Sequence, residues 1–92
     1  MPLKTEEKET IIKLAKEYGA KKVWLFGSML ESNPKTEPGD IDIAVEGIPP
    51  EIFFMFWSAL DSKFRQNIDL VYLDNDPPIR HIVFKRGMII YG

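Results

Sequence analysis

The order of apolar segments along this chain predicts an α/β (α+β) fold in which helices and strands alternate within one domain. Residues 5–18 and 49–65 carry apolar side chains at helical spacing over several turns. Three shorter apolar runs have the length and the bounding residues of strands: 21–26, 40–46 and 67–73. A short helix over 28–31, another over 78–86 and a final strand over 88–91 complete the order α-β-(short α)-β-α-β-α-β.

The first helix is predicted from a stripe formed by Ile11, Ala15 and Tyr18. Acidic residues are concentrated in its first turns, where the helix dipole favours negative charge. Gly19 follows the last turn and is a typical stop signal for a helix. The charged residues of this segment therefore indicate an ordinary solvated face.

The second long helix is apolar almost all round. A stripe of Phe53, Trp57, Leu60 and Phe64 is predicted to face the sheet. That leaves an excess of apolar side chains at Phe54, Met55 and Phe56. Such an excess indicates a contact with a partner protein, a homodimer contact, or packing against the final helix.

Composition excludes several classes of protein. The 92 residues contain no cysteine, which rules out disulfides and thiolate metal sites, and the length predicts one domain over residues 1–92. The net charge is −2 with no basic cluster, so a nucleic acid is not expected as the direct substrate. No apolar run approaches the ~20 residues that span a bilayer, and the charged N-terminus lacks a signal peptide, so a cytoplasmic location is expected.

A combination of small and acidic residues stands at strand positions. Gly27 and Ser28 follow the first strand, where backbone N–H groups can hold an anion. Asp40 and Asp42 occur in the second strand on one face, and Asp69 lies inside the third. Adjacent carboxylates repel one another, and burying them is costly unless they are paired or bound to a cation. Their hard oxygens favour Mg²⁺ or Mn²⁺, and two such ions could activate a hydroxyl and bind a leaving diphosphate.

Other charged residues carry weaker signals. Six cations could reach a triphosphate or a partner, although solvated surface charge is the simpler interpretation of each one: Lys35, Lys63, Arg65, Arg80, Lys85 and Arg86. His81 is the single histidine, and a position on a helix face or at a cap is expected for it. No pattern suggests a Ser–His–Asp triad.

These motifs resemble those of the minimal nucleotidyltransferases (MNT) of the DNA polymerase beta superfamily. The resemblance covers nearly the whole chain. It is carried by four segments: Phe26-Gly27-Ser28, the strand from Asp40 to Val45, Ile68-Asp69-Leu70-Val71, and the closing run from Gly87 to Tyr91. The chain departs from the pattern where relatives usually carry an arginine soon after Gly-Ser, because Met29, Leu30 and Glu31 stand there.

The resemblance implies a small mixed sheet flanked by helices. It also implies that Gly27 and Ser28 hold the nucleotide phosphates, that Asp40 and Asp42 bind two Mg²⁺ ions, and that Asp69 completes one metal site and helps to deprotonate the attacking hydroxyl. ATP would be the substrate and diphosphate the leaving group. Proteins of this kind are commonly antitoxins of a HEPN-domain toxin encoded nearby, and they neutralise it by binding, by transferring AMP to it, or by both.

Three functions remain open at this point. The first is AMP transfer from ATP to a hydroxyl of a partner protein. The second is a partner-binding antitoxin whose site is weak or silent, which the apolar excess and the absent arginine favour. The third is a nucleotidyltransferase subunit acting on a small molecule, for which a second subunit would have to supply the acceptor pocket.

Overall fold

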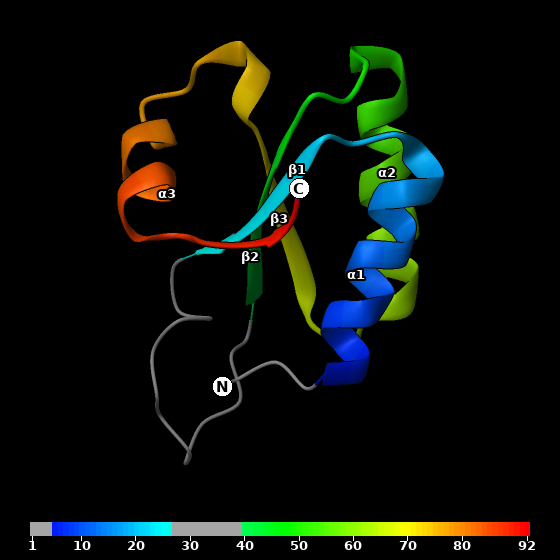
Figure 1. Cartoon of the computed structure of the whole chain (residues 1–92). Helices are drawn as coiled ribbons and strands as arrows, with labels where there is room; N and C mark the ends of the chain where they lie inside the picture. The colour runs from blue at the N-terminus through cyan, green and yellow to red at the C-terminus, as the bar shows by residue number, and fades with distance from the viewer. Residues whose placement is uncertain (1–4, 27–39) are drawn as a thin grey trace.

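The computed structural model describes residues 5–26 and 40–92 of the chain, apart from the side chain of Asp40. The predicted mixed sheet flanked by helices is confirmed (Figure 1). In chain order the elements are α1 (Thr5–Tyr18), β1 (Lys22–Phe26), β2 (Asp40–Glu46), α2 (Pro50–Lys63), β3 (Asn67–Tyr72), the 3₁₀ turn η2 (Leu73–Asn75), α3 (Arg80–Arg86) and β4 (Met88–Tyr91). The helix predicted over 28–31 lies outside the described residues.

The four strands have the order β3-β2-β1-β4. β1 is antiparallel to both β2 and β4, whereas β2 and β3 are parallel. A parallel pair needs a crossover connection, and α2 provides it. A mixed sheet was expected, but not this pairing, because register depends on contacts that are distant in sequence.

One face of the sheet is covered by α1 and α2 (Figure 1). The alternate residues of β2 on this face, Ile41, Ile43 and Val45, are fully buried against the two helices. α1 contributes Ile11, Leu14 and Ala15 to the same core. It ends at Gly19, whose φ of +77° confirms the predicted stop, because glycine adopts positive φ without steric cost.

The other face carries a smaller apolar cluster under α3. It is formed by Trp24 and Phe26 of β1, Ala44 of β2, Leu73 of η2 and Val83 of α3. α3 lies on the opposite side of the sheet from α2 (Figure 1). The predicted alternative in which the apolar excess of α2 packs against the final helix is therefore wrong.

The buried stripe of α2 differs from the prediction. Phe53, Phe56 and Leu60 are buried at a spacing of three and four residues, while Trp57 and Phe64 are only half-buried. Phe56 is therefore a core residue rather than part of an apolar excess, and it packs against Tyr18 of α1. Phe54 and Met55 remain 70% and 54% exposed.

Element boundaries differ from the predictions mainly near prolines and at strand ends. α3 begins at Arg80 rather than at residue 78, because Pro77 and Pro78 form the preceding turn. β3 ends at Tyr72, since Leu73 turns into the 3₁₀ segment and is buried there. Within the described ranges, no helix is both long enough and apolar enough to cross a membrane.

Candidate active site

Asp42 and Asp69 are partners in the register of the parallel strands β2 and β3. Partners in a parallel pair point to the same side, and neighbouring strands lie about 4.8 Å apart. Asp42 also pairs with Phe26 of β1. A row formed by Phe26, Asp42 and Asp69 therefore crosses three strands on the face that carries α3.

Phe26 is the member of this row that belongs to the apolar cluster under α3. The next row along the strands contains Trp24, Ala44 and Val71, and these belong to the cluster under α3. Asp69, in contrast, is exposed, and Asp42 is half-buried. Asp42 and Asp69 thus lie in the row next to a small apolar cluster.

The exposure of Asp69 corrects one expectation. An acid inside an apolar run suggested a buried charge that needs a cation to offset its desolvation. Because β3 is an edge strand and α3 covers the other end of this face, Asp69 retains its water and carries little such cost. A cation site is therefore supported by the register pairing of Asp42 and Asp69, and not by burial of the Asp69 carboxylate.

The edge strand that carries Asp69 is fixed in place by α2. The indole nitrogen of Trp57 donates a 2.8 Å hydrogen bond to the carbonyl oxygen of Ile68. The backbone N–H of Ile68 donates to the carboxylate of Asp61 at 3.3 Å. Both outward-facing backbone groups of the residue before Asp69 are therefore satisfied, which is how edge strands are protected and held.

The remaining predicted site residues are only partly described. Gly27 and Ser28 lie outside the described residues. Asp40 opens β2 and pairs in register with Asn67, but its side chain lies outside the described part of the chain. Among the side chains that are described, no group of three or more His, Asp or Glu forms a metal-binding cluster. The Asp42–Asp69 pair fits a divalent cation by its donor chemistry, because Mg²⁺ prefers carboxylate oxygens and retains several waters.

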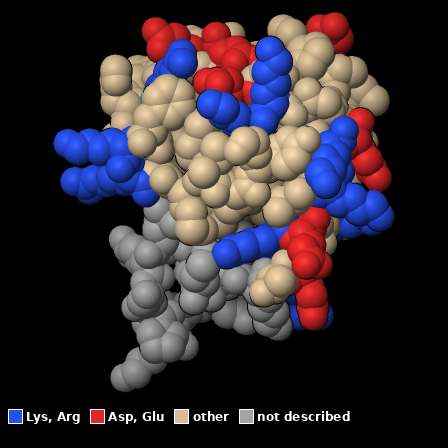
Figure 2. All heavy atoms as spheres, viewed as in Figure 1, with Lys and Arg blue, Asp and Glu red and all other residues tan. Residues whose placement is uncertain are grey.

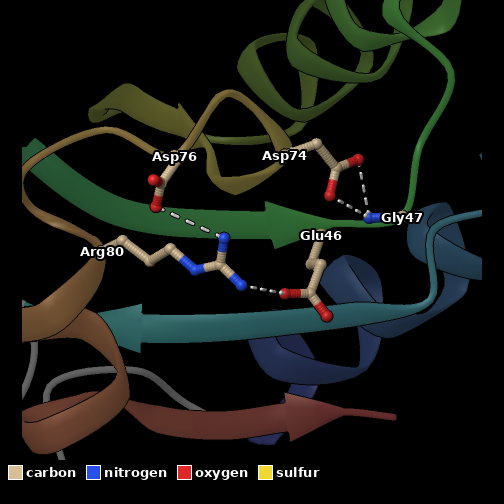
Figure 3. A network of polar contacts seen from close by, with 5 residues as sticks. All are labelled: Glu46, Gly47, Asp74, Asp76 and Arg80. Atoms are coloured by element: carbon tan, nitrogen blue, oxygen red, sulfur yellow. Dashed lines mark hydrogen bonds and ion pairs between the residues drawn. The ribbon is translucent and has the colours of Figure 1, made fainter.

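A polar network that the sequence did not indicate ties α3 to the far end of β2 (Figure 3). The guanidinium of Arg80 lies between two carboxylates, 3.6 Å from Glu46 and 3.5 Å from Asp76. It also lies over the ring of Phe84, 4.8 Å from the centroid. Asp76 and Phe84 each lie four residues from Arg80, whereas Glu46 belongs to β2, so no local spacing could have predicted the contact with Glu46.

Asp74 forms the second part of the same network. Its carboxylate accepts from the backbone N–H of Gly47 at 3.0 and 3.1 Å, which ties η2 to the end of β2 (Figure 3). The hydroxyl of Tyr72 donates to the carbonyl oxygen of Ile48 at 2.6 Å. Desolvation first, and then the nearby Asp74 carboxylate, raises the pKa of Tyr72 above its ordinary value of 10.0. These contacts stabilise the frame of the site but lie at the opposite end of the strands from the acids.

The basic residues singled out in the sequence are dispersed. Arg80 belongs to the network just described, while Lys63, Arg65, Lys85 and Arg86 are exposed. His81 lies on an exposed side of α3, as predicted. Figure 2 shows acidic and basic side chains distributed over the visible face with uncovered neutral surface between them.

Solved structures with the same fold include members of toxin–antitoxin complexes. A chain from the complex MntA–HepT shares 23% identity with a TM-score of 0.73, over 97% of this chain and 73% of that one. A second match is a chain from the complex of a tri-AMPylated Shewanella oneidensis HEPN toxin with MNT antitoxin. It shares 24% identity with a TM-score of 0.74, and the match covers 100% of this chain and 73% of that one. A toxin–antitoxin complex with AMP-PNP contains a chain with 26% identity and a TM-score of 0.73, over 92% of this chain and 73% of that one.

No curated protein matches this chain in sequence. The family described as "Polymerase beta, Nucleotidyltransferase", however, matches residues 9–92, which include every described strand and the Asp42–Asp69 pair. The fold matches and the family match both extend over almost the whole chain. The chain therefore belongs to the polymerase beta nucleotidyltransferase family.

Proposed function

We propose that this chain, as a single domain over residues 1–92, is a metal-dependent nucleotidyltransferase that transfers AMP from ATP to a hydroxyl of a partner protein. The proposed partner is a HEPN-domain toxin, which the chain would neutralise as an antitoxin in the cytoplasm. Support for the partner comes from the complexes named above, one of which contains a tri-AMPylated HEPN toxin and another AMP-PNP.

The observation that carries the proposal is the register pairing of Asp42 with Asp69 on the face of the sheet that carries α3. In the proposed site, Asp40 adds a third carboxylate from the start of β2, and Gly27 and Ser28 hold the phosphates. Two Mg²⁺ ions bound by Asp40, Asp42 and Asp69 would supply Lewis-acid stabilisation of the charge on the phosphoryl group.

The topology gives this site two distinct sides. β3 is the edge strand and Asp69 is exposed on it, so a macromolecular hydroxyl has access from the β3 side. β1 lies on the other side of Asp42 and leads toward α3 and β4. An in-line displacement needs this arrangement, because the attacking and leaving oxygens occupy opposite sides of the phosphorus.

The proposed reaction balances with the groups named. The hydroxyl oxygen of the partner forms a bond to the α-phosphorus of ATP, and the bond from that phosphorus to the bridging oxygen of the β-phosphate breaks. Diphosphate leaves with the bonding electron pair. Asp69 takes the hydroxyl proton, since it lies on the side from which the acceptor approaches and keeps contact with water.

The test is incubation of the chain with α-labelled ATP, Mg²⁺ and the product of the neighbouring gene. We expect label on the partner, loss of transfer on chelation, and a fall of at least about a hundredfold for Asp42→Asn and Asp69→Asn. Glu51→Gln is the matched control, because Glu51 is an exposed acid in the first turn of α2, away from the α3 face. Unlabelled partner, or equal transfer by Asp42→Asn, would overturn the proposal.

Metal binding by the proposed site can be measured without the acceptor protein. A ligand that binds only the folded state raises stability by mass action, so Mg²⁺ well above its Kd should raise the Tm of the wild type. The rise should disappear in Asp42→Asn and persist in Glu51→Gln. A wild-type Tm that is insensitive to Mg²⁺ in the presence of ATP would contradict a metal-dependent site.

A second candidate function is neutralisation by binding alone. It is favoured by the apolar side chains of Phe54 and Met55 on α2, which are 70% and 54% exposed. In that case, a variant carrying both Asp42→Asn and Asp69→Asn would still suppress the toxin and copurify with it. Loss of suppression with copurification intact would show that binding is insufficient. The same surface could serve a homodimer. Light scattering would reveal it as a doubled molecular mass of the isolated chain.

A further inference from the structure

We propose that Arg86 binds the terminal phosphates of the nucleotide from the last turn of α3. The inference rests on the proposed function, because it places the α-phosphate at the Asp42–Asp69 pair. Among the cations of α3, Arg86 suits this role because it lies at the end of the helix nearest the site and has no ion-pair partner among the described residues.

The first step is the placement of the end of α3. β4 follows α3 after a single residue, and Met88 pairs in register with Leu25 of β1. Gly87 approaches so closely that an added Cβ would lie 3.2 Å from the carbonyl oxygen of Leu25 and in collision with that of Val83. The last residue of α3 is therefore held beside the carboxyl end of β1, next to the row of Phe26, Asp42 and Asp69.

The second step is the direction in which Arg86 leaves the helix. Val83 is buried in the cluster on this face, and Ile79 packs against the same cluster. Arg86 is three residues after Val83 and seven after Ile79, so it shares their side of the helix. Phe84 and Arg80 occupy another side, where the ring of Phe84 is tilted against that of Trp24 with centroids 5.3 Å apart, and Arg80 lies over Phe84.

The third step is charge. Arg80 forms ion pairs with Glu46 and Asp76, and no ion pair between described residues involves Arg86. Arg86 is exposed, and Figure 2 shows basic side chains projecting from the side on which Figure 1 draws α3. Its guanidinium is therefore available to an anion, and its planar donors suit phosphate oxygens.

The fourth step is distance. From Asp42 to β4 there are two strand spacings, about 10 Å in total. A triphosphate that extends from the acids over β1, together with one arginine side chain, covers this span. The cation then lies on the side of the leaving group, opposite the acceptor side at β3. It would stabilise the charge that develops on diphosphate.

The experiment compares the affinities of Mg²⁺-ATP and AMP by calorimetry for the wild type and three variants. Arg86→Ala should weaken ATP binding about 10- to 100-fold, the range for a lost charge-assisted hydrogen bond, and change AMP binding less than about twofold. Arg86→Lys should recover part of the loss. Lys85→Ala is the matched control, because Lys85 is two residues from Val83 and points away from the sheet.

Several outcomes would overturn the inference: equal losses for ATP and AMP, no loss in Arg86→Ala, or the same loss in Lys85→Ala. If the wild type binds ATP through Arg86 but transfers no AMP, the inference stands and the proposed function fails. If AMP is transferred while Arg86→Ala binds ATP as the wild type does, the inference alone fails. A wild type that binds no ATP contradicts both.

Discussion

The indole of Trp57 holds the backbone of Ile68, the residue immediately before Asp69, through a 2.8 Å hydrogen bond. This contact joins α2, the crossover helix, to the edge strand β3 next to Asp69, a carboxylate of the candidate site. Trp57 therefore has a role that its half-buried packing alone does not reveal.

Trp57→Phe should test that role, because it keeps an aromatic ring and removes the donor. We expect a loss of about 1 kcal/mol in the free energy of unfolding, measured by urea denaturation, since a part-buried carbonyl loses its partner. Phe54→Leu, on an exposed position of the same helix, should change stability by no more than about 0.5 kcal/mol. Equal effects of the two changes would contradict the assignment.

Arg80→Gln removes the cation that links α3 to β2. Because the Arg80 and Glu46 side chains are 33% and 26% exposed, solvent screens the pair, and we expect a loss of roughly 1 kcal/mol or less. The loss should shrink as salt is raised to about 1 M. Lys85→Gln makes the same change in charge without an ion partner among the described residues, and it should leave the urea midpoint unchanged.

The two phenylalanines Phe54 and Phe56 should differ sharply on truncation. Phe56→Ala empties a fully buried position and is expected to cost about 3–5 kcal/mol. Phe54→Ala removes a side chain that is 70% exposed and should alter stability by less than about 0.5 kcal/mol. If Phe54 belongs to a partner surface, its truncation should weaken partner binding at unchanged Tm. Comparable destabilisation by both changes would contradict the buried stripe described for α2.

The raised pKa of Tyr72 predicts how the stability of the fold depends on alkaline pH. The raised pKa of its hydroxyl means that the folded state keeps the proton at pH values where the unfolded state loses it. The contribution of Tyr72 is therefore fully present below pH 10 and is lost as pH rises through the folded pKa. The fall in Tm between about pH 9 and pH 11 should be smaller in Tyr72→Phe than in the wild type. An ordinary pKa for Tyr72, measured by ultraviolet titration against that variant, would contradict the prediction.

Local sequence patterns predicted most of the framework because they determine local structure. Apolar spacing indicated the two long helices and the strands, and Gly19 marked the end of α1. The buried stripe of α2 was predicted less well. An almost wholly apolar helix has no unique stripe in sequence, and only contact with Tyr18 and the sheet selects Phe56 over Trp57.

The candidate site was predictable as a set of residues but not as a geometry. The Asp-x-Asp pattern and the later Asp69 marked the acids, yet their register pairing depends on the length of the α2 crossover. The exposure of Asp69 depends on how much of the sheet α3 covers, and the Arg80 network on where that helix lies. Such features arise from tertiary packing, which no single window of sequence contains. The roles of Gly27, Ser28 and Asp40 stay predictions.

The crossover through α2 also has a kinetic consequence. Asp42 acquires its neighbour only when a segment synthesised much later docks alongside β2 as a parallel strand. Long-range parallel pairing is slow because the intervening chain must be ordered first. A nascent chain that ends before β3 would present Asp42 without Asp69, so the proposed chemistry would require the polypeptide to have been synthesised through β3.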